Sequence, residues 1–72
     1  MQKVTGYYMA SEAYMRKSIG AQISRVYKTP SDAMNFYGSI QPTWNLFKVF
    51  GSLVYDEGDT MDVVLDNYEI YR

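Results

Sequence analysis

The chain has 72 residues, contains no Cys and no His, and carries a formal net charge of −1 from seven basic and eight acidic side chains. The missing Cys excludes disulfides, and without His as well the common zinc, iron and copper ligand sets and the usual catalytic bases and thiols are absent. We therefore expect a non-enzymatic protein without metal or cofactor, folded as one domain over residues 1–72, of which 47% are hydrophobic.

The distribution of apolar and charged residues sets expectations about location and partners. No apolar run approaches the roughly 20 residues of a membrane span, and the first residues lack the apolar segment of a secretory signal. We expect a cytoplasmic protein without membrane contact. Residues 1–50 carry six basic and two acidic side chains, whereas residues 51–72 carry one basic and six acidic ones. This asymmetry either steers a partner or holds two parts of the fold together.

The first half of the chain predicts a strand followed by a helix. Residues 2–10 are rich in β-forming side chains and predict a strand. Ser11 then precedes an acidic first turn, which is typical of a helix N-cap. Apolar residues recur at helical spacing from there, which predicts a helix over about 12–28. Because Gly20 interrupts this helix, a second hairpin over 13–28 stays open as the alternative.

The next segment predicts a second, shorter helix. Thr29 and Pro30 end the preceding element, since proline disfavours a helical residue before it and is favoured at the first helical position. Thr29 is thus the expected N-cap of a helix over about 30–40. Gln41 and Pro42 then close this helix.

The last third of the chain predicts a hairpin with strands at about 44–55 and 59–71. Its expected loop is Asp56-Glu57-Gly58, with glycine supplying positive φ at the third loop position. This loop sets Tyr55 opposite Asp59. The pairs that follow match apolar with apolar residues and one cation with one anion, among them Leu53 with Met61, Phe50 with Val64 and Lys48 with Asp66. The predicted fold is therefore α+β, in the order β-α-α-β-β, with an antiparallel sheet packed on two helices.

Both faces of this predicted hairpin are apolar. One face holds Val49, Leu53, Met61 and Leu65. The opposite face holds an aromatic and aliphatic set made of Trp44, Leu46, Phe50, Tyr68 and Ile70. Because two helices cover one face of a small sheet, this second set is either wrapped by the rest of the chain or is an interface for another protein or a second copy of this chain. We take the five residues as the first candidate interaction site.

The acids near the hairpin tip form a second candidate. They are Asp56, Glu57, Asp59 and Asp62. Their spacing does not match the alternating acids and final glutamate of an EF-hand, so we expect no calcium site. They are instead an acidic contact face that presents carboxylates to a partner, or simply a solvated loop.

A nucleic-acid interface is the alternative from another class. The basic residues Arg16, Lys17, Arg25 and Lys28 fall on the polar side of the predicted helix over 12–28, and two helices before a hairpin are compatible with a winged-helix-like regulator. The acidic hairpin tip argues against this reading, because it would repel phosphate.

The leading hypothesis is a small non-enzymatic protein that acts through protein–protein interaction, either as a monomer or as a homodimer. Cysteine-free, histidine-free and slightly acidic chains of this size include phage or mobile-element accessory proteins that inhibit a host enzyme or a defence complex. This narrower hypothesis rests on size and composition alone.

Overall fold

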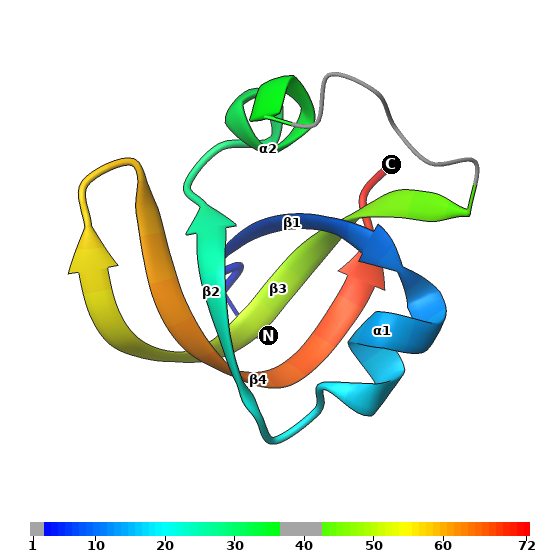
Figure 1. Cartoon of the computed structure of the whole chain (residues 1–72), viewed down its shortest axis with the longest axis horizontal. Helices are drawn as coiled ribbons and strands as arrows, with labels where there is room; N and C mark the ends of the chain where they lie inside the picture. The colour runs from blue at the N-terminus through cyan, green and yellow to red at the C-terminus, as the bar shows by residue number, and fades with distance from the viewer. Residues whose placement is uncertain (1–2, 37–42) are drawn as a thin grey trace.

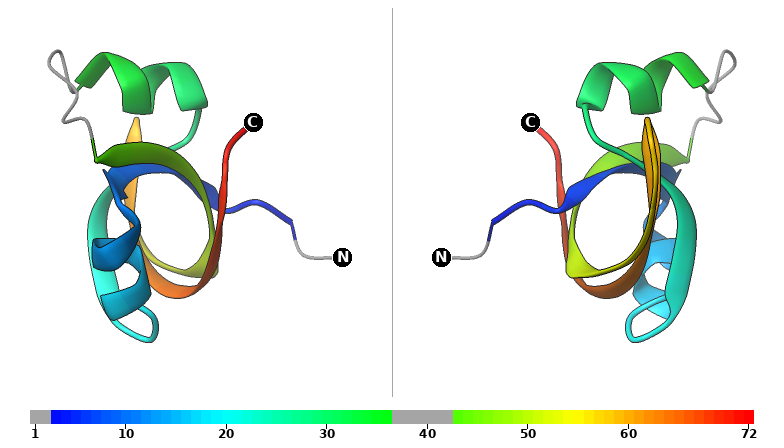
Figure 2. Two further views of the ribbon diagram at one scale, coloured as in Figure 1. Left: turned by 90° about the vertical axis from the view of Figure 1, so that its right-hand side faces the viewer. Right: turned by 90° about the vertical axis from the view of Figure 1, so that its left-hand side faces the viewer.

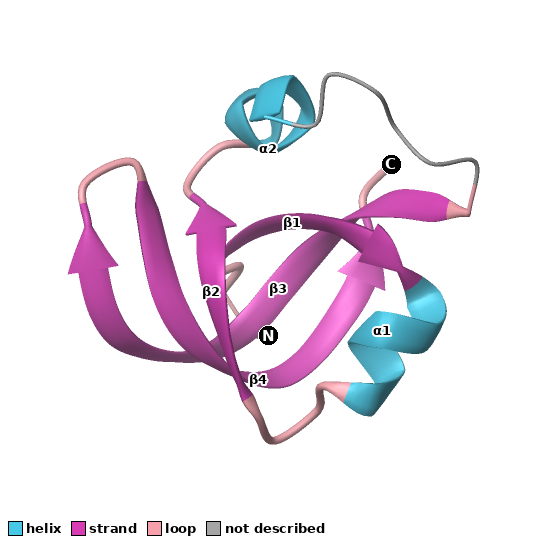
Figure 3. Ribbon diagram, viewed as in Figure 1, coloured by secondary structure: helices cyan, strands magenta, loops and turns pink. Residues whose placement is uncertain are grey.

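A computed structural model describes residues 3–36 and 43–72, and in it four antiparallel strands close into a small barrel. Around the barrel the strands follow the order β1-β2-β4-β3, and two short helices connect them (Figure 1). The elements are β1 (Gly6–Ser11), α1 (Glu12–Lys17), β2 (Gln22–Tyr27), α2 (Pro30–Phe36), β3 (Trp44–Glu57) and β4 (Thr60–Ile70). The predicted α+β fold is confirmed, with one strand more than expected between the helices (Figure 3).

The predicted helix over 12–28 is correct only at its start. The Ser11 Oγ accepts a hydrogen bond from the Tyr14 backbone N–H at 3.1 Å, so the predicted cap is confirmed. The helix ends at Lys17, and Gly20 then adopts a φ of 85°, a conformation that ends helices. The following residues form β2, which pairs with β1 and β4. The alternative of a second hairpin over 13–28 is wrong as well.

A β-bulge explains why β2 has the apolar spacing of a helix. The pairing of β2 with β4 shifts between Ile23 and Val26, and Arg25 within this bulge has a φ of 60°. A bulge inserts one extra residue into a strand. Ile23 and Val26 are therefore both buried although they lie three positions apart, which in a regular strand would put them on opposite faces.

The second helix begins where the sequence predicts. The Thr29 Oγ1 accepts a hydrogen bond from the Asp32 backbone N–H at 3.2 Å, and Pro30 is the first helical residue. The described part of α2 ends at Phe36. The rest of the predicted helix over 30–40, and its predicted end at Gln41 and Pro42, lie outside the described residues. Neither helix in the described ranges is long and apolar enough to cross a membrane.

The hairpin of β3 and β4 is confirmed, but its predicted turn and register are wrong. Gly58, with a φ of 82°, is the first of two turn residues, and Glu57 pairs with Thr60. A glycine at this place gives a tight turn whose twist matches the strands. Tyr55 consequently faces Asp62 instead of Asp59. Lys48 likewise faces Glu69 instead of Asp66. The pairing of β3 with β4 also shifts by one residue between Phe50 and Gly51 and again between Leu53 and Tyr55.

The barrel interior is a continuous apolar core. Its largest fully buried side chains are Phe47, Leu65, Val26, Val49 and Val63 from the strands, and Met15 of α1 packs against them from outside the ring. Of the face predicted to be core, Val49, Met61 and Leu65 are buried, whereas Leu53 is 57% exposed. A second, smaller cluster made of Met9, Tyr27 and Ala33 lies between β1, β2 and α2.

Close approach at Gly51 lets β3 bend as it leaves β1. A Cβ at this position would overlap the Val64 carbonyl oxygen and lie 2.7 Å from Val63 Cγ1. The Thr5 hydroxyl lies on the other side of Gly51, where it accepts from the Gly51 N–H at 3.1 Å and donates to the Gly51 carbonyl at 3.0 Å. With β3 curved in this way, the strands form a ring, and α1 and α2 lie outside it (Figure 2).

Candidate protein-binding site

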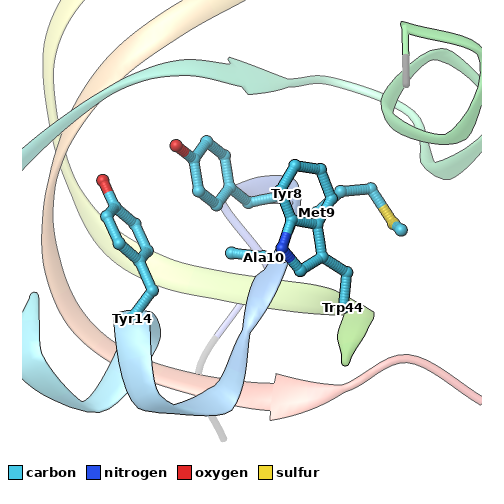
Figure 4. Close-up of a pocket in the computed structure, with 5 residues that line it drawn as sticks. All are labelled: Tyr8, Met9, Ala10, Tyr14 and Trp44. Atoms are coloured by element: carbon cyan, nitrogen blue, oxygen red, sulfur yellow. The ribbon is translucent and has the colours of Figure 1, made fainter. Parts of the chain in front are cut away.

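A hollow of about 180 Å³ opens on the surface where β1, α1 and the start of β3 meet. Its lining consists of Tyr8, Met9, Ala10, Tyr14 and Trp44, and we call it the Trp44 hollow. Figure 4 shows Tyr8 and Tyr14 with their hydroxyl groups toward the same side, and the Trp44 indole beyond Ala10. None of these five side chains is charged. The hollow is thus suited to an apolar group.

The base of the hollow is part of the core. Ala10 is 7% exposed and belongs to the barrel core, whereas Met9 is 4% exposed and belongs to the smaller cluster. Successive residues of a strand point to opposite faces, so β1 contributes to both clusters and joins them at this place. Because Met9 and Ala10 are held by packing on both sides, the base of the hollow is formed before any partner arrives.

The aromatic walls are positioned by the helix cap and by strand pairing. The cap at Ser11 fixes the first turn of α1 and with it Tyr14, whose carbonyl also accepts a hydrogen bond from the Ser18 hydroxyl at 2.8 Å. The Tyr14 ring stacks on Tyr8, with 5.9 Å between centroids and 24° between planes. Pairing of β1 with β3 places Trp44 opposite Ser11.

The structure divides the aromatic and aliphatic set predicted from the hairpin. Trp44 and Leu46 pack against the smaller cluster of Met9, Tyr27 and Ala33. Tyr68 packs instead on the barrel core, where its ring meets Phe47 edge to face with 5.3 Å between centroids.

The other two members of the set differ in exposure. Phe50 is 7% exposed and is therefore a core residue, whereas Ile70 is 40% exposed at the end of β4. The predicted contiguous patch is thus wrong, because the register shift after Phe50 and the pairing of β1 along 44–49 separate its members. Trp44 is the member that lines a surface hollow.

Comparisons with protein-family models, with curated proteins and with solved structures found no match.

The predicted acidic face is spread around the hairpin tip. Asp56, Glu57 and Asp59 are exposed, whereas Asp62 is half-buried on β4. Asp56 accepts a hydrogen bond from the Lys28 ammonium at 3.0 Å and another from the Gly58 N–H at 3.0 Å. Both donors stabilise the carboxylate, the Lys28 side chain most, and they hold the pKa of Asp56 below its ordinary value of 3.8. Across residues 3–36 and 43–72, no three acidic side chains gather to hold a metal ion.

The four basic residues predicted to share one helix lie on different elements. Arg16 and Lys17 are in the last turn of α1, and Arg16 lies 3.8 Å from the Glu12 carboxylate. Arg25 lies in the bulge of β2, and Lys28, just beyond β2, is paired with Asp56 across to the hairpin. The prediction that these four residues share the polar side of one long helix is wrong, because β2 replaces the second half of that helix.

Four lining residues of the hollow were missed in the sequence: Tyr8, Met9, Ala10 and Tyr14. A local signal exists only for Tyr14, which follows the predicted Ser11 cap by three positions. Trp44 comes close to them through the pairing of β1 with β3, which joins residues more than 30 positions apart. No local pattern predicts such a pairing, so the residues could not be grouped from the sequence.

Proposed function

We propose that this chain is a non-enzymatic protein-binding domain and that the Trp44 hollow receives one apolar side chain of a partner protein. The observation that carries the proposal is the hollow itself, a preformed depression with one indole and two phenol rings in its wall and no charged lining residue. Tryptophan and tyrosine are enriched among the residues that contribute most to protein–protein affinity.

The size of the hollow fits one ring or one branched aliphatic side chain. Its volume is about 180 Å³, and an apolar cavity of about 150 Å³ is known to accept a benzene molecule. Tyr14 is 40% exposed and stands at the rim, where it can pack against the partner around the inserted side chain. A single anchored side chain surrounded by a less critical rim is the common arrangement of such interfaces.

The buried base lowers the cost of binding. Met9 and Ala10 are already packed, and the Ser11 cap restrains the turn that holds Tyr14. A site that is ordered before binding loses little side-chain entropy when the partner docks. The lining also supplies no carboxylate, amine or imidazole, which supports binding in preference to catalysis. The narrower hypothesis of a phage or mobile-element inhibitor gains no further support from this geometry.

Photocrosslinking tests the proposal. A benzophenone amino acid replaces Tyr14 at the rim of the hollow, and in a matched control it replaces Ile19, which is 46% exposed in the turn after α1. Each protein is irradiated in lysate of the native host, and adducts are identified by mass spectrometry. We expect a protein adduct at position 14 that excess wild-type protein suppresses and that excess folded Trp44→Ser protein does not.

Two outcomes would contradict the proposal. One is the same adduct at position 19 with comparable yield, which would mean nonspecific contact. The other is equal suppression by wild-type and Trp44→Ser protein, which would place the contact outside the hollow. Thermal melting of Trp44→Ser is required beforehand, because Trp44 is half-buried and packs on the smaller cluster.

A further inference from the structure

Within residues 3–36 and 43–72, the outer half of β3, residues 52–57, has a strand partner on one side only. Pairing of β3 with β1 covers Trp44 to Val49, and the last contact on that side in the described chain is the hydrogen bonding of Thr5 with Gly51. Pairing with β4 continues on the other side to Glu57. In Figure 1 this segment is the outermost strand on the left, with β4 between it and β2. We call residues 52–57 the outer β3 edge.

The outer β3 edge is unusually apolar for an unpaired strand. Leu53, Val54 and Tyr55 are consecutive and are 57%, 49% and 57% exposed. Exposed edges of monomeric proteins usually carry charged residues or prolines that prevent pairing with another chain. A run of three large apolar side chains on an unpaired edge therefore indicates a site for strand addition.

We propose that the outer β3 edge pairs antiparallel with the same edge of a second copy of this chain, so that the two sheets continue into one another. The sequence of the edge is complementary to itself. With Val54 of both copies on the two-fold axis, Leu53 faces Tyr55 of the second copy, and Ser52 faces Asp56 of the second copy. Apolar side chains then meet apolar ones, as stable cross-strand pairs require.

The charges of the edge are compatible with this arrangement. Asp56 is paired with Lys28 of its own chain at 3.0 Å, so its charge is balanced before association. Glu57 would face Gly51 of the second copy, on the side where the segment from Lys3 to Thr5 approaches β3. The Thr5 hydroxyl already bonds both backbone groups of Gly51, so regular pairing with the second copy ends at Ser52. In this register no two carboxylates face each other.

The expected dimer is small and reversible. The edge has six residues, and the register shift between Leu53 and Tyr55 marks a bulge at Val54, which interrupts regular pairing at the centre of the contact. Such a contact buries less than the roughly 1,200 Å² of a standard interface, so association should depend on concentration. This surface lies apart from the Trp44 hollow, and the proposal does not depend on the function proposed for the hollow.

Nuclear magnetic resonance of the wild-type chain tests the pairing directly. Backbone amide shifts are recorded from dilute protein up to about 1 mM, where weak association becomes visible. We expect saturable shifts that concentrate at residues 52–57, together with a rise of the sedimentation mass toward twice that of the monomer. A monomer at every concentration overturns the proposal, and so do shifts that centre on another surface.

Two variants locate the contact independently. Val54→Lys brings two amines together at the two-fold axis and should abolish the rise in mass. Ile19→Lys is the matched control, because Ile19 is 46% exposed and lies outside the edge, and it should dimerise like the wild type. A folded Val54→Lys protein that still dimerises overturns the proposal, as does loss of the dimer in Ile19→Lys. If Val54→Lys fails to fold, the wild-type shifts decide.

Discussion

Replacing Phe47 and Leu53 by alanine distinguishes the observed hairpin register from the one that the sequence predicts. Phe47 is fully buried, and its ring meets Tyr68 edge to face with 5.3 Å between centroids. Leu53, which the predicted register places in the core, is 57% exposed. The two substitutions remove a large apolar side chain from the same strand, so their costs can be compared directly.

The expected costs differ by several kcal/mol. Truncating a buried phenylalanine to alanine usually lowers the free energy of unfolding by about 3–5 kcal/mol, and the lost contact with Tyr68 places Phe47→Ala near 4 kcal/mol. Leu53→Ala should cost about 0.5 kcal/mol or less, since most of the side chain is already in water. A chain of 72 residues has a total stability of roughly 4–11 kcal/mol. Phe47→Ala therefore removes at least a third of it.

Urea denaturation followed by circular dichroism measures both costs. We expect the midpoint of Leu53→Ala to lie close to that of the wild type, and Phe47→Ala to be strongly destabilised or unfolded without urea. The milder Phe47→Leu should still fold, with a melting temperature lower by roughly 4–8 °C for each kcal/mol lost. The predicted register places Phe47 and Leu53 on the same core face, so a loss of about 2–5 kcal/mol for Leu53→Ala would refute the observed arrangement and favour the predicted one.

Three further outcomes follow from the fold and the charges. Gly51→Ala should lower the free energy of unfolding by about 1–3 kcal/mol, since its Cβ would overlap the Val64 carbonyl, and the adjacent exposed Ser52→Ala serves as the control in the same urea titration. The pKa of Asp56 in the folded chain lies below its ordinary value of 3.8. The ionised Asp56 carboxylate therefore stabilises the fold fully above about pH 3.8, and this stabilisation is lost as the pH falls through the folded pKa. Wild type should therefore melt above Asp56→Asn at pH 7, and the gap should close at low pH; a gap that persists below the folded pKa would contradict this. In a gel shift at about 50 mM salt, a random nucleic acid should not bind, because the four predicted basic residues are dispersed and two of them are ion-paired; binding that weakens steeply toward about 200 mM would contradict the protein-binding account.

Local signals in the sequence were sufficient for the helix starts and for the hairpin. The caps at Ser11 and Thr29 depend on side chains that bond to a backbone N–H three residues ahead, and both are present. The hairpin depends on two β-rich stretches around Gly58, and both form strands. Each of these features is decided by residues that are neighbours in the chain, so the sequence alone could predict them.

Features that depend on distant contacts could not be predicted in the same way. The bulge at Arg25 gives β2 the apolar spacing of a helix, and only pairing with β1 and β4 identifies it as a strand. The residues around Gly58 are compatible with either a two-residue or a three-residue turn. Which turn forms determines the cross-strand partner of every residue in the hairpin. The hollow depends on the pairing of Ser11 with Trp44, which joins two ends of distant strands. Barrel closure therefore decides both the fold and the site.

The central claim is that the Trp44 hollow accepts one apolar ring, and methyl NMR with toluene as the probe tests it most directly. Met9 and Ala10 line the hollow, and their methyl groups serve as reporters of binding, whereas the methyl of Met34, which is 48% exposed on α2, provides an internal reference in the same spectra. The account predicts saturable shifts at Met9 and Ala10, with little change at Met34 and weaker binding in folded Trp44→Ser. Shifts at Met9 and Ala10 that do not exceed those of Met34, or that never saturate, would contradict it.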